Sequence, residues 1–199
     1  MTANITLAKG SHPPGQDCGN PQRCLFEWYN WITRQRQTDD RPPGVSSVLH
    51  TFGMRLNDCL PDDRRQQLVR FLPNGADRLA GTEGDGKDEI RGYLALDWLI
   101  RTYAPAWLDL AGLTAEATAL RDLRRIADLV AAQSAGPVVR EASAKADAAR
   151  NAAWDAAGDA ARDAARDAAD KRLAPTVDLL QDSAVALYDA MITGEQPGA

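Results

Sequence analysis

The chain has 199 residues, and its 28 acidic and 23 basic residues give a net charge of −5. Such a chain is poorly suited to non-specific binding of nucleic acid or anionic membranes, because both need a basic surface. No run of 18 apolar residues occurs, so we expect no transmembrane helix and no membrane partner. Aromatic residues make up only 6% of the chain, which predicts a core that relies on close helix contacts.

The first third of the sequence predicts an irregular segment followed by three short helices. Prolines and glycines interrupt residues 1–22, and a helix should begin near Pro21 and run to about residue 35. Ser46 or Ser47 can cap a second helix over 48–60, and Pro61 suits the first turn of a third. The inward-facing residues predicted for these helices are Leu25, Trp28, Tyr29, Ile32, Val48, Leu49, Phe52, Leu56, Leu68, Phe71 and Leu72.

A glycine-rich loop over residues 79–89 leads into the next predicted helix. The stretch EGDGKDE within it matches neither the spacing of a calcium-binding EF-hand nor that of a phosphate-binding Walker loop. It fits a flexible loop that ends in an acidic first turn of helix. That helix should extend to about Tyr103, where Pro105 interrupts it, and a short further turn should stop at Gly112.

The remaining sequence predicts three more helices divided by prolines. Thr114 can cap a helix over 115–132, with an apolar side made by Ala117, Leu120, Leu123, Ile126, Ala127 and Val130. Gly136 and Pro137 should separate it from an alanine-rich helix over 138–173. Pro175 should break that helix from a last one over 176–192, whose apolar stripe is Val177, Leu180, Ala184, Leu187 and Met191.

The alanine-rich helix contains a four-residue repeat, AAWDAAGDAARDAARDAAD, over residues 152–170. Each unit advances about 400° around a helix, so the alanine stripe drifts by roughly 40° per unit. It therefore cannot form one straight apolar face. Either neighbouring helices approach the alanines closely at different levels, or the helix projects as a charged rod that binds a partner. Trp154 should anchor the helix to the rest of the protein, and Gly158 should be its weakest point.

These patterns together predict an all-α fold. No stretch alternates apolar and polar residues for long enough to indicate a strand. We expect a multi-helix bundle of about seven helices with one long alanine-rich helix. The expected organisation is an irregular segment over 1–22, a helical domain over 23–135, and a long helix plus C-terminal helix over 138–192 that pack on the same domain.

Residues suited to catalysis or metal binding are few. The two histidines, His12 and His50, and the three cysteines, Cys18, Cys24 and Cys59, show no metal-binding spacing, so no metal or cofactor is predicted. Convergence of the cysteines with His50, or a nucleophilic pair of Cys24 and His50, remains open. The odd number of cysteines favours a reducing, cytoplasmic environment, and no signal peptide is evident.

An aromatic group surrounds an expected ion pair between Asp97 and Arg101, which lie four residues apart on one predicted helix. The pair can hold helices in register or mark a pocket. The alternative pocket is made of the side chains Glu27, Asp97, Trp98, Arg101 and Trp107.

Several motifs in chain order resemble a family of uncharacterised helical proteins from high-GC Gram-positive bacteria and their phages. These motifs are CLFEW (24–28), DRPPGVSSVL (40–49), RLAGT (78–82) and DWLIRTYAPAWLDLAGL (97–113). The chain has Gly44 and Arg41 where the family pattern has a cysteine and a histidine. The alanine-rich part also resembles, by composition, immunity proteins of polymorphic toxin systems. The resemblance implies no catalytic residues.

The sequence therefore favours a non-catalytic helical protein-binding module, an immunity-like inhibitor or an adaptor, that contacts a protein partner or a second copy. A small-ligand-binding protein or enzyme with a pocket around Trp98, Arg101 and Trp107 is the first alternative, and a structural oligomeric component is the second. The predicted partner-binding residues are Trp154, Asp155, Asp159, Arg162, Asp163, Arg166 and Asp167.

Overall fold

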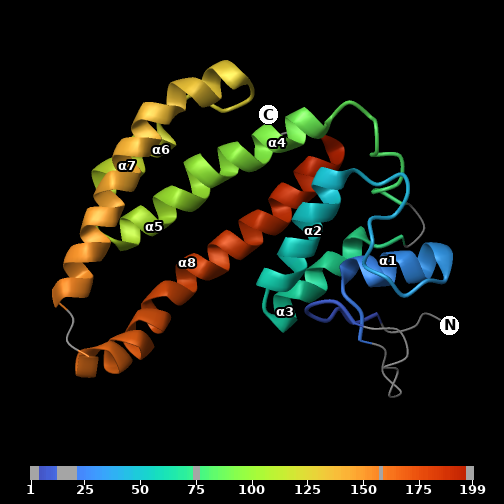
Figure 1. The fold of residues 1–199 in the computed structure, drawn as a ribbon, viewed down its shortest axis with the longest axis horizontal. Coiled ribbons are helices and arrows are strands. Elements are labelled where there is room, and N and C mark those ends of the chain that lie inside the picture. Colours follow the sequence, from blue (N-terminus) through green and yellow to red (C-terminus); the bar gives the residue numbers. More distant parts are fainter. Residues whose placement is uncertain (1–4, 13–21, 74–76, 157–158, 196–199) are drawn as a thin grey trace. The chain divides into compact units, whose positions relative to one another are not determined.

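The structure is a computed structural model that describes residues 5–12, 22–73, 77–156 and 159–195, and within these ranges the side chains of 151–172 are outside the description. All named elements in the described ranges are helices, accompanied by one isolated parallel bridge between Leu7 and Arg23 (Figure 1). The predicted all-α fold is therefore confirmed. None of the helices in these ranges is long and apolar enough to cross a membrane.

The chain forms two compact units. The first unit comprises Met1–Gly92 and Ala184–Ala199, and the second comprises Tyr93–Ser183. Helices α4 (Asp88–Trp98) and α8 (Asp159–Thr193) each run from one unit into the other. This division differs from the predicted domains over 23–135 and 138–192, because the end of α8 packs into the core of the first unit.

Helix α1 (Leu25–Arg34) begins with a capping box. Cys24 occupies the N-cap, and the backbone N–H of Cys24 donates to the carboxylate of Glu27 over 2.7 Å. The helix therefore starts at Leu25 and not near Pro21. Every residue from 25 to 30 is buried, which is more than the predicted stripe, because neighbouring segments cover α1 on several sides.

Helix α2 (Ser47–Cys59) begins where the sequence predicted. The Ser46 hydroxyl accepts hydrogen bonds from the backbone N–H groups of Val48 and Leu49, over 3.2 and 3.3 Å. Pro61 precedes α3 (Asp62–Arg65), which continues as the 3₁₀ helix η1 (Gln66–Phe71). The predicted inward residues of this segment, Leu68, Phe71 and Leu72, are all buried.

The end of α8 fills the centre of the first unit. Tyr188 is fully buried, with its ring 5.9 Å from that of Phe52 and 4.9 Å from that of Phe71. Gly53 of α2 lies directly under this ring, because a Cβ there would be 2.6 Å from the Tyr188 hydroxyl oxygen. The predicted stripe of the last helix is confirmed at its buried positions Leu180, Ala184, Leu187 and Met191, whereas Val177 is half-buried.

In the second unit, α4 passes through the π-helical turn η2 (Leu99–Tyr103) into α5 (Ala104–Leu110). Pro105 was predicted to interrupt the helix here, and that prediction is wrong. The Ala104 N–H donates to the carbonyl of Leu99, five residues earlier, and the widened turn accommodates the proline ring at the start of α5. Gly112 ends α5 with a φ of +77°, as predicted.

The predicted helix over 115–132 is instead split into two. Helix α6 (Thr114–Arg121) has Leu113 at its N-cap, so Thr114 is its first residue and not its cap. After a turn, the Asp128 carboxylate accepts a hydrogen bond from the Ala131 N–H over 2.7 Å near the start of α7 (Leu129–Ala156). Short polar residues satisfy helix ends in this way, which sets the beginning of α7 at residue 129.

Two further prolines lie inside helices and not between them. Helix α7 contains Pro137, with Gly136 before it, and α8 contains Pro175. The breaks predicted at these positions are therefore wrong. The high helix propensity of the surrounding alanines offsets the backbone hydrogen bond that each proline removes. The predicted continuity of the helix over 138–173 across Gly158 falls on residues 157–158, which lie outside the described residues.

Candidate functional site

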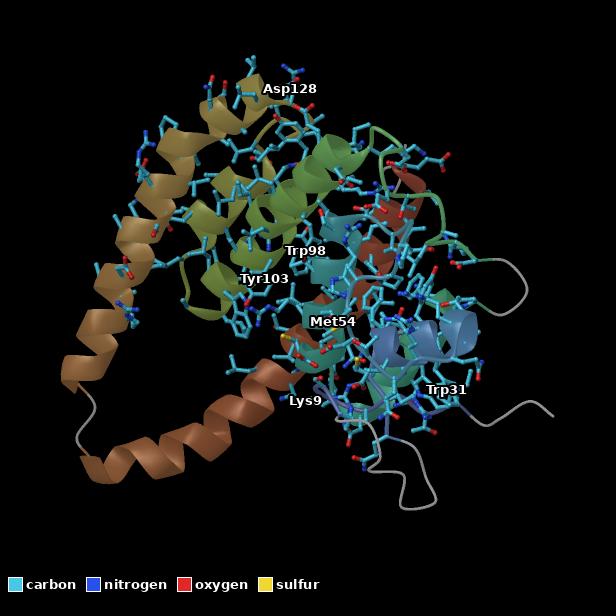
Figure 2. All side chains as sticks on the ribbon, turned by 45° about the vertical axis from the view of Figure 1, so that its right-hand side comes forward. Lys9, Trp31, Met54, Trp98, Tyr103 and Asp128 are labelled. Atoms are coloured by element: carbon cyan, nitrogen blue, oxygen red, sulfur yellow. The ribbon has the colours of Figure 1, made fainter. Side chains whose placement is uncertain are left out.

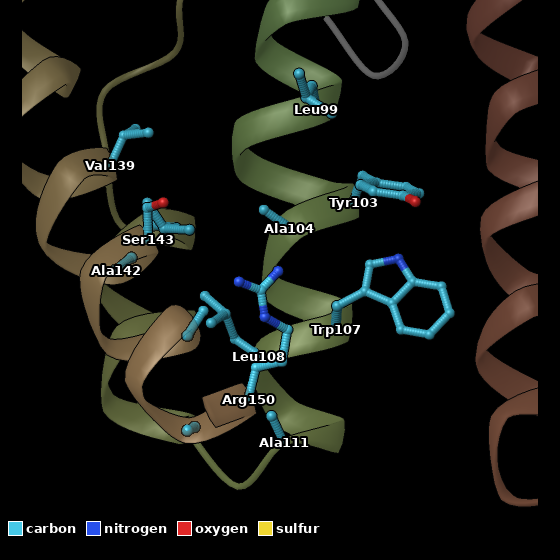
Figure 3. Close-up of a pocket in the computed structure, with 13 residues that line it drawn as sticks. Leu99, Tyr103, Ala104, Trp107, Leu108, Ala111, Val139, Ala142, Ser143 and Arg150 are labelled. Carbon is cyan, nitrogen blue, oxygen red and sulfur yellow. The ribbon is translucent and has the colours of Figure 1, made fainter. Parts of the chain in front are cut away.

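An apolar groove lies in the second unit between α5 and α7, with α6 beneath it (Figure 3). It encloses about 580 Å³. The walls come from η2 and α5 on one side and from α7 on the other, and Leu120 of α6 also lines it. We call this feature the α5–α7 groove. Its lining residues are Leu99, Tyr103, Ala104, Trp107, Leu108, Ala111, Leu120, Val139, Ala142, Ser143, Ala146, Ala149 and Arg150.

The α7 wall of the groove consists mainly of small side chains. Ala142, Ala146 and Ala149 lie four and three residues apart, which places them on one face of the helix. Figure 3 shows the short side chains of this wall facing α5. The spacing differs from that of the strict four-residue repeat further along the chain, so this face stays straight. It leaves space that larger residues would fill.

Aromatic residues form one end of the α5 wall. The Tyr103 ring lies 5.3 Å from that of Trp98 and 6.1 Å from that of Trp107, between centroids (Tyr103 and Trp98 are labelled in Figure 2). Tyr103 and Leu99 are 37% and 46% exposed, which is unusual for large apolar side chains on neighbouring turns. The indole N–H of Trp107 is buried and has no hydrogen-bond partner among the described residues. Figure 3 shows the Trp107 indole on the side of α5 away from α7, so the groove itself presents mainly apolar surface.

The predicted pocket of five side chains is only partly reproduced. Trp107 lines the groove, whereas the Trp98 indole donates to the Ser183 hydroxyl over 2.9 Å. Glu27 belongs to the first unit and the other four residues to the second.

The predicted ion pair between Asp97 and Arg101 is present, at 3.4 Å. Asp97 also accepts from the Ile126 N–H over 2.8 Å, and Arg101 donates to the carbonyl of Arg121 over 3.3 Å. The pair therefore links the turn between α6 and α7 to α4 and η2. These bonds hold the helices that line the groove in register with one another.

Glu27 is a buried structural carboxylate. It accepts hydrogen bonds from the backbone N–H groups of Cys24 and His12, over 2.7 and 2.6 Å, and pairs with Nδ1 of His12 at 2.9 Å. The spacing of Cys24 and Glu27, which matches a capping box, was the sequence signal for this role. Burial raises the pKa of the Cys24 thiol to about 12, so this thiol stays protonated and is a poor nucleophile.

The groups considered for metal binding do not form a ligand set. Within the described ranges, no three residues among His, Cys, Asp and Glu are close enough to hold a metal ion. His50 donates from Nε2 to the carbonyl oxygen of Asp39 over 2.8 Å, and its ring lies 4.5 Å from that of Phe26. Cys59 is exposed, and Cys18 lies outside the described residues.

A buried arginine in the first unit was missed by the sequence analysis. Arg91 has no exposed surface, and it pairs with Asp85 and Asp88 at 2.6 and 2.8 Å. Its Nε donates to the carbonyl of Met191 over 3.0 Å, which attaches the end of α8 to the glycine-rich loop. The loop predicted as flexible thus contributes Asp85 to an ion cluster around a buried arginine. The three-residue spacing of Asp88 and Arg91 was its local signal, but the contact with Met191 has none.

The carboxylates of this cluster titrate at lower pH than usual. A hydrogen bond from Arg91 lowers the pKa of Asp85, and hydrogen bonds from Ser46 and then from Arg91 lower the pKa of Asp88. Both carboxylates are therefore charged when the cluster is intact.

The predicted partner-binding side chains lie outside the part of the chain that the structure describes. Trp154, Asp155, Asp159, Arg162, Asp163, Arg166 and Asp167 all fall in 151–172, where the side chains lie outside the description. Their backbone belongs to the ends of α7 and α8 that flank residues 157–158.

Comparison with known proteins adds no assignment, since no family model, curated protein or solved structure matches the chain.

Proposed function

We propose that the protein is a non-catalytic helical binding module, an adaptor or an immunity-like inhibitor, and that the α5–α7 groove receives a helix of a protein partner. The observation that carries the proposal is the alanine wall of α7. Helices pack with their axes about 8–10 Å apart, and small residues permit the closest approach. An amphipathic helix that lays its apolar face into such a groove is a recurring mode of recognition.

The state of the reactive side chains supports a role that does not involve bond-making. Cys24 is buried with a raised pKa, and Glu27 is engaged by Cys24 and His12. The Tyr29 hydroxyl donates to Asp77 over 2.6 Å, and this contact together with burial raises the pKa of Tyr29. Each of these groups is used to hold the first unit together.

The groove proposal can be tested with a phage-displayed library of 20-residue helix-forming peptides. We expect enriched peptides to carry apolar residues at positions i, i+3, i+4 and i+7, the spacing of one helix face. Ala146→Trp fills the groove and should weaken binding of an enriched peptide at least about tenfold, or roughly 1.4 kcal/mol. Ala148→Trp is the matched control, because Ala148 is exposed on α7 and does not line the groove.

Two results would count against the groove. In the first, selection on the unmodified chain enriches no peptide beyond those that selection on the Ala146→Trp variant also enriches. In the second, both tryptophan variants bind the selected peptide as tightly as the unmodified chain. Circular dichroism and the midpoint of urea unfolding show whether each variant keeps its fold.

A small apolar ligand is the second candidate occupant of the same groove. A volume of about 580 Å³ falls in the range of small-molecule pockets, and the lining of this groove is mainly apolar. The probe is the dye 1-anilinonaphthalene-8-sulfonate, whose emission rises in apolar sites. Saturable dye binding that Ala146→Trp abolishes, without any enriched peptide, would favour this function over protein binding.

The charged face over residues 155–171 remains a separate predicted surface. If it carries the partner contact, replacing Asp159, Asp163 and Asp167 with lysine should abolish partner binding, whereas Ala146→Trp should leave that binding unchanged.

Self-association through the alanine-rich helix is the structural alternative. Light scattering at high protein concentration distinguishes this alternative from partner binding, because a molar mass equal to that of one chain would rule out an oligomeric scaffold.

A further inference from the structure

The N-terminal residues 6–12, which we call the strap, cross the first unit against α1, α2 and η1. The side-chain amide of Gln66 forms hydrogen bonds with both the backbone N–H and the backbone carbonyl of Leu7. The Leu7 N–H donates to Oε1 over 2.8 Å, and Nε2 donates to the Leu7 carbonyl over 3.0 Å. The next residue is held in the same way, because the Ala8 N–H donates to the carbonyl of Arg23 and the Ala8 carbonyl accepts from Asn57.

Contacts of this kind continue along the strap in both directions. The Trp28 indole donates to the carbonyl of Thr6 over 2.9 Å. The Gly10 N–H donates to the carboxylate of Asp58 over 2.9 Å. At the end of the strap, Glu27 accepts from the His12 N–H and pairs with the His12 ring. Main-chain groups of five strap residues are therefore satisfied by groups 15 to 59 positions away in sequence.

Three positions of the strap are constrained in their side chain or backbone. Leu7 is 2% exposed and is the buried apolar anchor. Gly10 has a φ of +82°, a conformation that residues with a Cβ adopt only with strain. His12 pairs with buried Glu27. Thr6, Lys9 and Ser11 are exposed (Lys9 is labelled in Figure 2), so their side chains are free to vary. The surface under the strap thus selects the pattern Leu-x-x-Gly-x-His.

These features match the way proteins recognise extended peptides. Hydrogen bonds to the main chain supply affinity, and pockets for particular side chains supply specificity. The strap receives nearly all of its hydrogen bonds from side chains of α1, α2 and η1, so nothing in the contacts requires that strap and groove belong to one molecule. A second copy offers an identical segment, and exchange of identical elements is a low-cost route to association.

We propose that the first unit contains a peptide-recognition groove, formed around Trp28, Asn57, Asp58 and Gln66, and that it accepts the strap of a second copy in place of its own. The strap of the same chain has the advantage of a high effective concentration, on the order of millimolar. Exchange therefore becomes visible when the chain's own strap is disabled. The site lies in the first unit, so its test is independent of the α5–α7 groove.

Two complementary variants test the exchange. Leu7→Asp disables the strap and leaves the groove intact, whereas Asp58→Ala with Gln66→Ala disables the groove and leaves the strap intact. Each variant alone should be monomeric by size-exclusion chromatography with light scattering, and the mixture should form a 1:1 heterodimer at tens of micromolar. Thr6→Asp replaces Leu7→Asp as the matched control, because Thr6 is exposed, and it should give no heterodimer. A mixture of folded variants that elutes only as monomers would overturn the proposal.

A peptide experiment on the Leu7→Asp chain, whose own strap no longer competes for the groove, gives a second test that does not need the Asp58→Ala, Gln66→Ala variant. The probe is a fluorescein-labelled peptide of residues 5–12, ITLAKGSH, whose anisotropy reports binding. We expect saturable binding that weakens at least about tenfold with Gly10→Val or Leu7→Asp in the peptide and is unaffected by Lys9→Ala. Equal behaviour of all four peptides, or no binding up to millimolar protein, would refute recognition of the strap in trans.

Discussion

At the scale of single residues, close approach and buried polar contacts determine how the first unit is joined. Tyr188 packs over Gly53, Glu27 receives the end of the strap, and Arg91 receives the end of α8. Of these roles, only the capping box of Glu27 had a local pattern that the sequence could reveal. The contacts of Gly53 with Tyr188 and of Arg91 with Met191 join residues one hundred or more positions apart, so these roles depend on the folded chain.

Gly53→Ala should destabilise the protein although alanine is the better helix former. The new Cβ would lie 2.6 Å from the Tyr188 hydroxyl oxygen and 2.9 Å from the Phe26 ring, and neither ring can move freely in the core. Such overpacking costs about 1–3 kcal/mol of unfolding free energy. Gly92→Ala is the control, because nothing lies within 4 Å of its Cβ, and it should raise stability by up to about 1 kcal/mol. Urea unfolding measures both, and a stabilised Gly53→Ala variant would contradict the observed packing.

The Arg91 cluster should make stability depend on acid pH. The pKa values of Asp85 and Asp88 are lower in the folded chain than in the unfolded one, so the unfolded chain binds more protons as the solution becomes acidic. The stabilisation is complete above the ordinary aspartate pKa of about 3.9 and is lost as the pH falls through the lowered values. Unfolding free energy should therefore decline below about pH 5.

Arg91→Met should flatten this acid dependence and lower stability at pH 7 by about 1–3 kcal/mol, since it leaves the Met191 carbonyl without its donor and removes the partner of Asp85 and Asp88. Arg124→Met is the control, because Arg124 is 78% exposed and lies 3.9 Å from Asp128. Its effect should stay below about 1 kcal/mol with an unchanged pH profile. Parallel profiles for the two variants between pH 3 and 7 would show that the cluster is not the source of the dependence.

At the scale of elements, the sequence predicted helices well and their ends poorly. Helical spacing of apolar residues is local, so Leu25, Leu68 and Met191 were placed correctly in the core. Prolines were treated as breaks, but Pro105 and Pro175 lie inside continuous helical stretches. The widened turn η2 and the strong helix propensity around Pro175 override the proline signal. The groove arises from side chains on separate elements, so only Trp107 of its lining residues had been assigned to a predicted pocket.

Pro175→Ala tests how much the proline weakens α8. Pro175 is exposed, and alanine would restore the missing N–H donor within the helix. We expect a gain in unfolding free energy of about 1–3 kcal/mol and a small increase in helical ellipticity. Thr176→Ala, at the next position, should gain no more than about 0.7 kcal/mol. A destabilised Pro175→Ala variant would mean that the packing of α8 depends on the ring of this proline.

At the scale of the whole molecule, the all-α class was predictable, whereas the division into two units was not. Composition and periodicity exclude long alternating strands locally. The attachment of α8 to the first unit depends instead on contacts between distant residues, such as Tyr188 packed over Gly53 and the hydrogen bond from Arg91 to Met191, one hundred positions apart. The first unit is thus closed by the end of the chain, and α4 and α8 are shared.

This sharing predicts that the two units unfold together. Unfolding the first unit alone would cut α4 between Gly92 and Tyr93 and α8 between Ser183 and Ala184, and each new helix end would leave about four backbone groups unpaired. Hydrogen exchange followed by mass spectrometry in rising urea should therefore give peptides of α2 and α6 the same opening free energy, and Arg91→Met should lower both equally. If only α2 lost protection in that variant, the second unit would be stable without the first, and the shared helices would be ordinary linkers.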